Sequence, residues 1–203
     1  MELQGRRQVP GLKLGAAAFL VALLPALSAR ADQVFLSEGD APRALFGSGV
    51  AAERKVLELS DGELADLGRL VGRKIEVRKY PYLEVSSAEP RPPGQPGPLQ
   101  GYAFVLDVIG QSLPITFAVG VKADGTVQDV QVMVYRESHG GEVRERRFRA
   151  QFSGKTLQQP LVVGKDVDAI SGATISSHSA AYAVRKGLAL AELLRRRGQR
   201  STR

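Results

Sequence analysis

Hydrophobic residues are concentrated in three neighbouring stretches in the middle of the chain, at 101–109, 114–122 and 126–136, and in the third they alternate with more polar ones. All three are rich in Val, Ile, Phe and Tyr, which favour strands. Asp124 and Gly125 separate the second stretch from the third, and Asp-Gly is a strong hairpin signal. The pattern therefore predicts an antiparallel meander of three strands.

Two other stretches have the spacing of apolar residues that is typical of amphipathic helices. Ser60 and Glu63 have the spacing of a capping box, and leucines follow until Gly72, which predicts a helix over 60–72. Small and apolar residues recur at helical spacing from Ser176 to Arg197, which predicts a second, longer helix.

Weaker patterns predict three further elements: at most a short helix around 43–46 within 32–50, a strand over 74–85, and a short helix over 142–152. Proline and glycine crowd residues 89–98, so we expect a stiff, exposed connection there. Together the elements predict an α+β fold, in which an antiparallel sheet is packed by helices.

A chain of 203 residues is long enough for one domain with a short appendage. It contains no cysteine, which excludes disulfides, thiolate metal sites, iron–sulfur clusters and c-type haem attachment. The histidines are His139 and His178, too few for a metal site built from histidine. Any redox chemistry therefore requires an organic cofactor.

The formal net charge of +7 is concentrated at the two ends of the chain. Basic residues prevail in 1–31 and after Glu192, whereas the section between them is close to neutral. We therefore expect no nucleic-acid partner. Arg195, Arg196 and Arg197 are expected to complement the C-terminus of the long helix, or alternatively to bind anionic lipid headgroups.

The first 31 residues have the organisation of a signal peptide: a short basic stretch, the apolar run 14–27, and small residues at Ala29 and Ala31. The apolar run is shorter than a bilayer's hydrocarbon core. We expect export and cleavage, a periplasmic location and association with the inner membrane. The expected division of the chain is 1–31 signal peptide, 32–100 N-terminal segment, 101–194 functional domain and 195–203 basic tail.

The candidate chemistry lies in Asp168-Ala169-Ile170-Ser171-Gly172-Ala173-Thr174, directly before the long helix. Backbone N–H groups at a helix N-terminus favour a bound anion. Gly172 and Ala173 leave room for a close approach, while Thr174, Ser176 and Ser177 supply hydroxyls. The residues alone leave three interpretations open: a plain N-cap, a non-covalent phosphate site, or a covalent phosphoester.

The string D-x-x-S-G-A-T resembles the flavinylation motif of the FMN-binding domain family, which includes peripheral subunits of the sodium-pumping NADH:quinone oxidoreductase and the Rnf complex. It matches at Asp168, Ser171, Gly172, Ala173 and Thr174. The resemblance implies that a flavin transferase, using FAD and magnesium, esterifies Thr174 with the phosphate of FMN. It gives Asp168 a supporting role.

The order of elements over residues 101–194 also resembles the family. The loop 135–141 is similar to the family's glycine-bearing loop, although the family's respiratory subunits usually read Glu-Thr-Pro-Gly there. The resemblance adds the following candidates for contact with the flavin: Glu137, His139, Gly140, Gly141 and Ser177.

We therefore expect an exported electron carrier with covalent FMN on Thr174, working between a membrane-associated donor and a downstream acceptor rather than as a stand-alone enzyme. The alternative is an exported, non-redox binding or assembly module with a non-covalent anion at the same helix terminus. The sequence Ser153-Gly154-Lys155-Thr156 lacks the leading glycine of a P-loop. A hydrolase triad is not expected, because the sequence has no G-x-S-x-G elbow.

The arginines of the predicted helix over 142–152 have two further possible uses. Most simply they form a solvated face. Alternatively, they pair with an acidic redox partner or stabilise a reduced, anionic flavin. The arginines concerned are Arg144, Arg146, Arg147 and Arg149.

Overall fold

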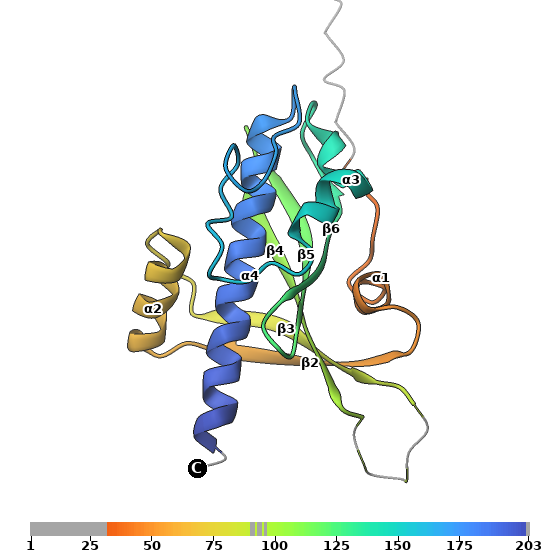
Figure 1. The fold of residues 1–203 in the computed structure, drawn as a ribbon, viewed down its shortest axis with the longest axis vertical. Helices are drawn as coiled ribbons and strands as arrows, with labels where there is room; N and C mark the ends of the chain where they lie inside the picture. Colours follow the sequence, from red (N-terminus) through yellow and green to blue (C-terminus); the bar gives the residue numbers. More distant parts are fainter. Residues whose placement is uncertain (1–31, 90–91, 93–94, 96, 202–203) are drawn as a thin grey trace, which may run out of the picture.

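The computed structural model describes residues 32–89, 92, 95 and 97–201, so the predicted signal peptide lies outside the described residues. Strands form a single sheet that helices cover on both faces (Figure 1). The elements in chain order are β1 (Gln33–Val34), α1 (Ala41–Phe46), β2 (Val50–Glu58), α2 (Asp61–Val71), β3 (Lys79–Ser87), β4 (Leu99–Ile109), β5 (Pro114–Lys122), β6 (Val127–Tyr135), η1 (Gly141–Arg144), α3 (Arg146–Arg149), η2 (Ala150–Phe152) and α4 (Thr174–Ser201).

The sheet is antiparallel throughout, with the strand order β1-β6-β5-β4-β3-β2. This confirms the predicted α+β fold and the meander β4-β5-β6. Asp124 Oδ1 accepts hydrogen bonds from the backbone N–H of Thr126 (2.8 Å) and from its hydroxyl (2.7 Å). Gly125 has φ +90°, a conformation that glycine adopts without strain. The Asp-Gly pair therefore forms the predicted β5–β6 turn.

Helices α4 and α2 lie on one face of the sheet and α1 lies on the other (Figure 1). The larger apolar core is between α4 and the sheet and includes Phe104, Phe117 and Leu188. The smaller one is between α1 and the sheet, around Leu45 and Met133. Strand β6 contributes to both cores, so both of its faces are buried.

The weaker sequence patterns are the ones that the structure corrects. Strand β3 begins at Lys79, not at residue 74, and it continues to Ser87. The single helix predicted over 142–152 is instead three short pieces, η1, α3 and η2. Glu145 separates the first two pieces because its backbone is extended, with ψ 137°.

The N-terminal segment 32–100 contributes to the same sheet as the rest of the chain. Strand β2, which the sequence did not predict, pairs along its whole length with β3, and β3 pairs with β4. Helix α1 matches the short helix expected around 43–46. Residues 101–194, expected from the sequence to form the functional domain, therefore share one sheet with residues 32–100.

Helix α2 is capped as its sequence predicts and is also linked to α4. The Ser60 hydroxyl accepts from the Glu63 N–H, and the Glu63 carboxylate accepts from the Ser60 N–H (2.9 Å). Arg197 donates to both oxygens of Glu63, at 2.7 and 2.6 Å. This guanidinium, together with the Ser60 hydrogen bonds, lowers the pKa of Glu63 to about 2.

The link explains part of the basic C-terminal stretch. The sequence analysis expected Arg195–Arg197 to complement the C-terminus of the long helix. Helix α4 continues to Ser201, so these arginines lie before its last turn, which corrects that expectation. Arg195 and Arg196 pair with Glu192, and Arg197 with Glu63. Much of the positive charge of this stretch is therefore matched by carboxylates.

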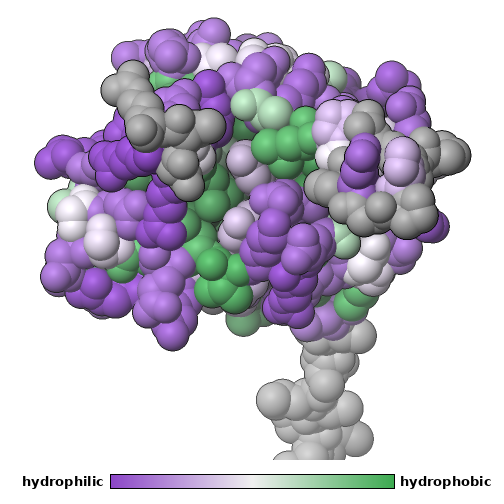
Figure 2. All heavy atoms as spheres, turned by 90° about the horizontal axis from the view of Figure 1, so that it is seen from below, coloured by the Kyte–Doolittle hydropathy of each residue, from purple (hydrophilic) through white to green (hydrophobic). Residues whose placement is uncertain are grey.

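Hydrophilic side chains cover most of the surface seen from below, and hydrophobic ones gather in a hollowed area near its centre (Figure 2). Within the residues that the structure describes, no helix combines the length and the apolar character needed to cross a membrane.

We predict that Glu63→Gln lowers the free energy of unfolding at pH 7 by about 1 to 2 kcal/mol. The substitution removes the negative charge of the side chain that accepts from the Ser60 N–H in the capping box, and with it the ion pair to Arg197. The lowered pKa of Glu63 means that its contribution is complete above its ordinary value of 4.5 and is lost as the pH falls to about 2. Urea unfolding at several pH values should therefore show the difference between wild type and variant shrinking over that range.

The matched control is Glu76→Gln, since Glu76 is 77% exposed and pairs with Lys74 on the surface. It should change the free energy of unfolding by less than about 0.5 kcal/mol. An equal loss in both variants at pH 7 would contradict the prediction.

We also predict that Gly187→Ala destabilises the protein, although alanine is the better helix former by about 1 kcal/mol. A Cβ atom at Gly187 would lie 2.7 Å from Val119 Cγ1 of β5. Overpacking of this kind costs about 1–3 kcal/mol, so thermal unfolding should show a net loss. Gly198→Ala in the same helix is the control and should be neutral or stabilising, because among the described residues no atom outside the adjacent helix backbone lies within 4 Å of its Cβ position.

Candidate functional site

The motif 168–174 ends the long loop after η2 and leads directly into α4 (Figure 1). Gly172 has φ +79°, which lets the chain turn sharply before the helix. Thr174 is the first residue of α4, and it is exposed. Its hydroxyl is therefore accessible from solvent at the helix N-terminus.

No side chain caps this helix within the part of the chain that the structure describes. The carbonyl of Ala173 accepts the first helical hydrogen bond, from the N–H of Ser177 (2.8 Å), so Ala173 is the N-cap residue and has no side-chain oxygen. The N–H groups of residues 174–176 have no acceptor among the described residues. Three donors therefore remain available for an anion, where the helix dipole also favours negative charge.

Ser177, a predicted site residue, is buried and supports the turn instead of facing solvent. Its hydroxyl donates to the Ala173 carbonyl (2.9 Å) and accepts from the Ile170 N–H (3.4 Å). The motif's backbone is therefore tied to the first turn of α4 by a side chain within the helix.

Asp168 is held by a residue that the sequence did not single out. The Asp168 N–H donates to Gln151 Oε1 (2.7 Å), and Gln151 Nε2 donates to the Asp168 carbonyl (3.5 Å). Both contacts use the backbone of Asp168, so its exposed carboxylate takes no part in them. Because the contact depends on tertiary structure, no local sequence signal identifies Gln151.

The loop after β6 meets the first turn of α4 through Tyr135. The Tyr135 hydroxyl is hydrogen-bonded to the His139 carbonyl and lies 2.9 Å from Ser176 Oγ. Burial raises the pKa of Tyr135, so the neutral phenol persists at neutral pH. Gly140 has φ +90°, and a Cβ atom there would lie 2.5 Å from Ser176 Oγ. The structure thus brings Gly140 against the motif's helix, as expected if loop and helix form one site.

Glu137 is directed at a different neighbour. Its Oε1 accepts from the N–H groups of Ser112 (2.6 Å) and Leu113 (2.8 Å), in the turn between β4 and β5. Close by, the hydroxyl of Ser179 in α4 donates to the Ile109 carbonyl at the end of β4 (2.9 Å). These contacts give Glu137 a role in fixing the β4–β5 turn beside α4. The His139 side chain is exposed.

A hollow of about 590 Å³ lies beside the motif, within the size range of small-molecule sites. Its wall combines the motif with α3 and η2, and two carboxylates and one guanidinium stand around it. The lining residues are Glu142, Arg147, Phe148, Gln151, Asp168, Ala169, Ile170 and Ser171. A smaller hollow of about 390 Å³ adjoins Gly141 and Glu142.

The arginines predicted to form a cluster near this loop contact different groups in the structure. Arg149 donates to both oxygens of Asp129 and to a backbone carbonyl, and is largely buried. Arg144 lies over the Phe35 ring, 4.0 Å from its centroid. Of the four arginines predicted to form the cluster, Arg147 lines the larger hollow, where it pairs with Glu145 (2.7 Å).

An α+β domain with an exposed hydroxyl, open N–H donors and a hollow at one helix terminus has the features of a domain that binds a phosphorylated cofactor. Residues 110–189 match the family model described as the FMN-binding domain. This stretch is therefore similar to domains that bind FMN, and the match supports a flavin-binding protein. No curated protein matches the chain.

We predict that Gly140→Ala disturbs the first turn of α4, because the added Cβ would meet Ser176 Oγ and the backbone has positive φ. Gly141→Ala is the control, since its Cβ position has no neighbour closer than 3.8 Å. Thermal unfolding should show a loss of about 1–3 kcal/mol for the first variant. A loss of the same size in Gly141→Ala would show that Ser176 is not the cause.

Proposed function

We propose that Thr174 carries FMN through a phosphoester and that the protein is an exported electron carrier. The observation that carries the proposal is the placement of Thr174. Thr174 is exposed at an uncapped helix N-terminus, three residues after Ser171 in the wall of the hollow, in a stretch that matches a flavin-binding family. A buried hydroxyl without a neighbouring hollow would have argued against attachment.

Attachment is a phosphoryl transfer in which FAD is the donor and a flavin transferase the catalyst. The Thr174 oxygen forms a bond to the phosphorus on the FMN side of the pyrophosphate, the bond to the AMP phosphate breaks, and the hydroxyl proton is released. No redox change is involved. The product is a phosphodiester that keeps one negative charge at the helix terminus.

The residues around Thr174 fit this group. The N–H groups of 174–176 and the helix dipole stabilise the phosphate's negative charge. Gln151, Ser177 and Tyr135 hold the motif and the first turn in place through the contacts above. The hollow beside the motif offers Phe148 and Ile170 as apolar wall for a ring system. When bound, FMN supplies the ability to accept and pass on electrons.

The carrier role is supported by exposure and by the tether. A group attached at an exposed helix terminus is accessible to both an electron donor and an acceptor. A covalent bond also prevents loss of the cofactor outside the cytoplasm, where it is not readily replaced. We place the donor at the membrane and the acceptor downstream, consistent with the signal-peptide pattern of residues 1–31.

The test is intact mass of the purified protein after co-expression with a flavin transferase. Wild type should gain the mass of one FMN minus water, and Thr174→Val should gain none, because the attacking oxygen is gone while the shape of the side chain is kept. Thr174→Ser keeps the oxygen and should retain attachment. Equal thermal unfolding of wild type and Thr174→Val before loading serves as the control for folding.

Two outcomes contradict the proposal. Attachment in Thr174→Val would place the bond on another residue. Flavin that copurifies with wild type but separates on denaturation, with no change in mass, would support the non-covalent binding module instead.

A further inference from the structure

Three exposed apolar side chains lie at the end of the molecule where α4 begins. Ile109 ends β4 and is 67% exposed, Leu113 directly precedes β5 and is 42% exposed, and Ile175 follows Thr174 in α4 and is 48% exposed. The Ser179 hydroxyl lies 2.9 Å from the Ile109 carbonyl oxygen and 3.1 Å from that of Ile175. The end of β4 and the first turn of α4 are therefore adjacent, and we call these three exposed residues the apolar tip.

Two carboxylates next to the apolar tip are bound by groups of the protein itself. Glu137 accepts a hydrogen bond from the backbone N–H of Leu113 (2.8 Å). Asp107, two residues before the end of β4, accepts from the Thr116 hydroxyl (2.6 Å). Burial of a carboxylate is costly when it has no hydrogen-bond donor. Both carboxylates keep a donor when the apolar tip approaches an apolar phase.

The described part of the chain begins beside the apolar tip. Asp32 accepts from Arg136 Nε (2.9 Å), and Arg136 Nη1 donates to the Pro114 carbonyl (3.1 Å). Pro114 is paired with Ile109 between β4 and β5. In the sequence, the apolar run 14–27 ends five residues before Asp32. Five residues span at most about 17 Å, so a leader inserted in a membrane would keep Asp32, and with it the apolar tip, close to the bilayer.

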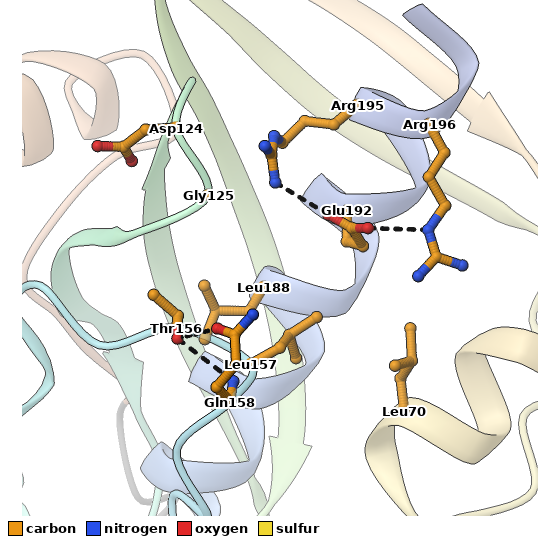
Figure 3. A pocket seen from close by; sticks show the side chains of 10 residues that line it. All are labelled: Leu70, Asp124, Gly125, Thr156, Leu157, Gln158, Leu188, Glu192, Arg195 and Arg196. Atoms are coloured by element: carbon orange, nitrogen blue, oxygen red, sulfur yellow. Dashed lines mark hydrogen bonds and ion pairs between the residues drawn. The ribbon is translucent and has the colours of Figure 1, made fainter. Parts of the chain in front are cut away.

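The opposite end of α4 differs in character. Glu192 accepts from Arg195 (3.0 Å) and from Arg196 (2.8 Å), so charged side chains pair with one another there (Figure 3). The hydrophobic side chains seen from below lie in a hollowed area, which a flat bilayer surface does not enter (Figure 2). Apolar contact with a bilayer is therefore favoured at the end that holds Thr174.

We propose that the apolar tip lies against the surface of a phospholipid bilayer, with its three side chains at the depth of the headgroups. Neighbouring exposed apolar side chains mark an interaction surface, and contact with lipid removes their area from water. A bilayer needs none of the directional hydrogen bonds that a protein interface usually contains. Three side chains give weak, reversible binding, so the leader supplies most of the attachment until it is cleaved.

This orientation would bring Thr174, one residue before Ile175, to the membrane, where we place the electron donor. The inference rests on the proposed export to the membrane, but it does not depend on attachment of FMN. A protein partner at the same surface is the competing interpretation, and the experiment separates the two.

The experiment uses tryptophan fluorescence, because the chain contains no tryptophan and an introduced one reports on a single position. The full chain, without FMN, is reconstituted with vesicles of phosphatidylethanolamine and phosphatidylglycerol. In a second set of vesicles the acyl chains are brominated near the headgroup and quench tryptophan on contact. Ile175→Trp should lose about half of its fluorescence in the brominated vesicles, because the side chain lies at headgroup depth.

Val77→Trp is the matched control. Val77 is 54% exposed, and its neighbour Arg78 pairs with Asp61 at the start of α2. Val77→Trp should not be quenched. Equal quenching at the two positions would overturn the proposed orientation. No quenching at position 175 would overturn contact with lipid and favour a protein partner.

A second comparison separates contact by the apolar tip from simple tethering by the leader. Ile109→Ser combined with Leu113→Ser, in the Ile175→Trp background, should reduce the quenching about twofold or more, because two of the three apolar contacts are lost. Leu99→Ser is the control, since Leu99 is 41% exposed at the other end of β4, and it should leave the quenching unchanged. Unchanged quenching in the double variant, or an equal loss in Leu99→Ser, would overturn the proposal. Failure of FMN attachment affects none of these measurements, because the protein carries no FMN in them.

Discussion

The close contact between α4 and strand β5 is the constraint on which the rest of the structure depends. Gly187 lies so near Val119 that no side chain fits between them, and this fixes which side of α4 faces the sheet. At about 100° per residue, Ser176 lies about three turns earlier on the same side and is buried. Thr174 lies roughly 140° away from that side, and it is exposed. The packing of α4 thus leaves Thr174 exposed to solvent, whereas the Ser176 hydroxyl lies inside and holds the first turn of the helix.

Elements with a strong local signal were predictable from the sequence. Strand β5 of the meander β4-β5-β6 is buried on both faces, so it is rich in Val, Ile and Phe, and the helix α2 carries its own capping box. Both signals are visible without tertiary structure. Strand β2 was missed for a physical reason. It is an edge strand whose side chains are mostly exposed, with Leu57 buried, so its residues carry almost no hydrophobic pattern. Its pairing with β3 creates the strand.

The residues of the candidate site also fall into those that the sequence identifies and those that only tertiary contacts identify. The motif 168–174 is contiguous, so its residues are identifiable by their order alone. Gln151 contacts that motif and Tyr135 contacts Ser176 in the first turn of α4, and both contacts form only when η2 and β6 are packed beside α4. Glu137 is the converse: the resemblance makes it a candidate for flavin contact, but its Oε1 contacts another part of the structure. A carboxylate that the resemblance places at a cofactor is seen in the structure to bind backbone N–H groups of a neighbouring turn.

An uncapped helix N-terminus is compatible with a stable fold here because its first two residues, Thr174 and Ile175, are exposed to solvent. Unpaired N–H groups are costly when they are buried, whereas exposed ones are satisfied by water. The first turn is held instead by Ser177, Tyr135 and Ser179, none of which contacts the Thr174 hydroxyl. The interactions that stabilise this end of α4 are therefore separate from the groups available to a phosphate. A domain organised in this way can fold before a cofactor is bound, which is the order that the proposed attachment by a separate transferase requires.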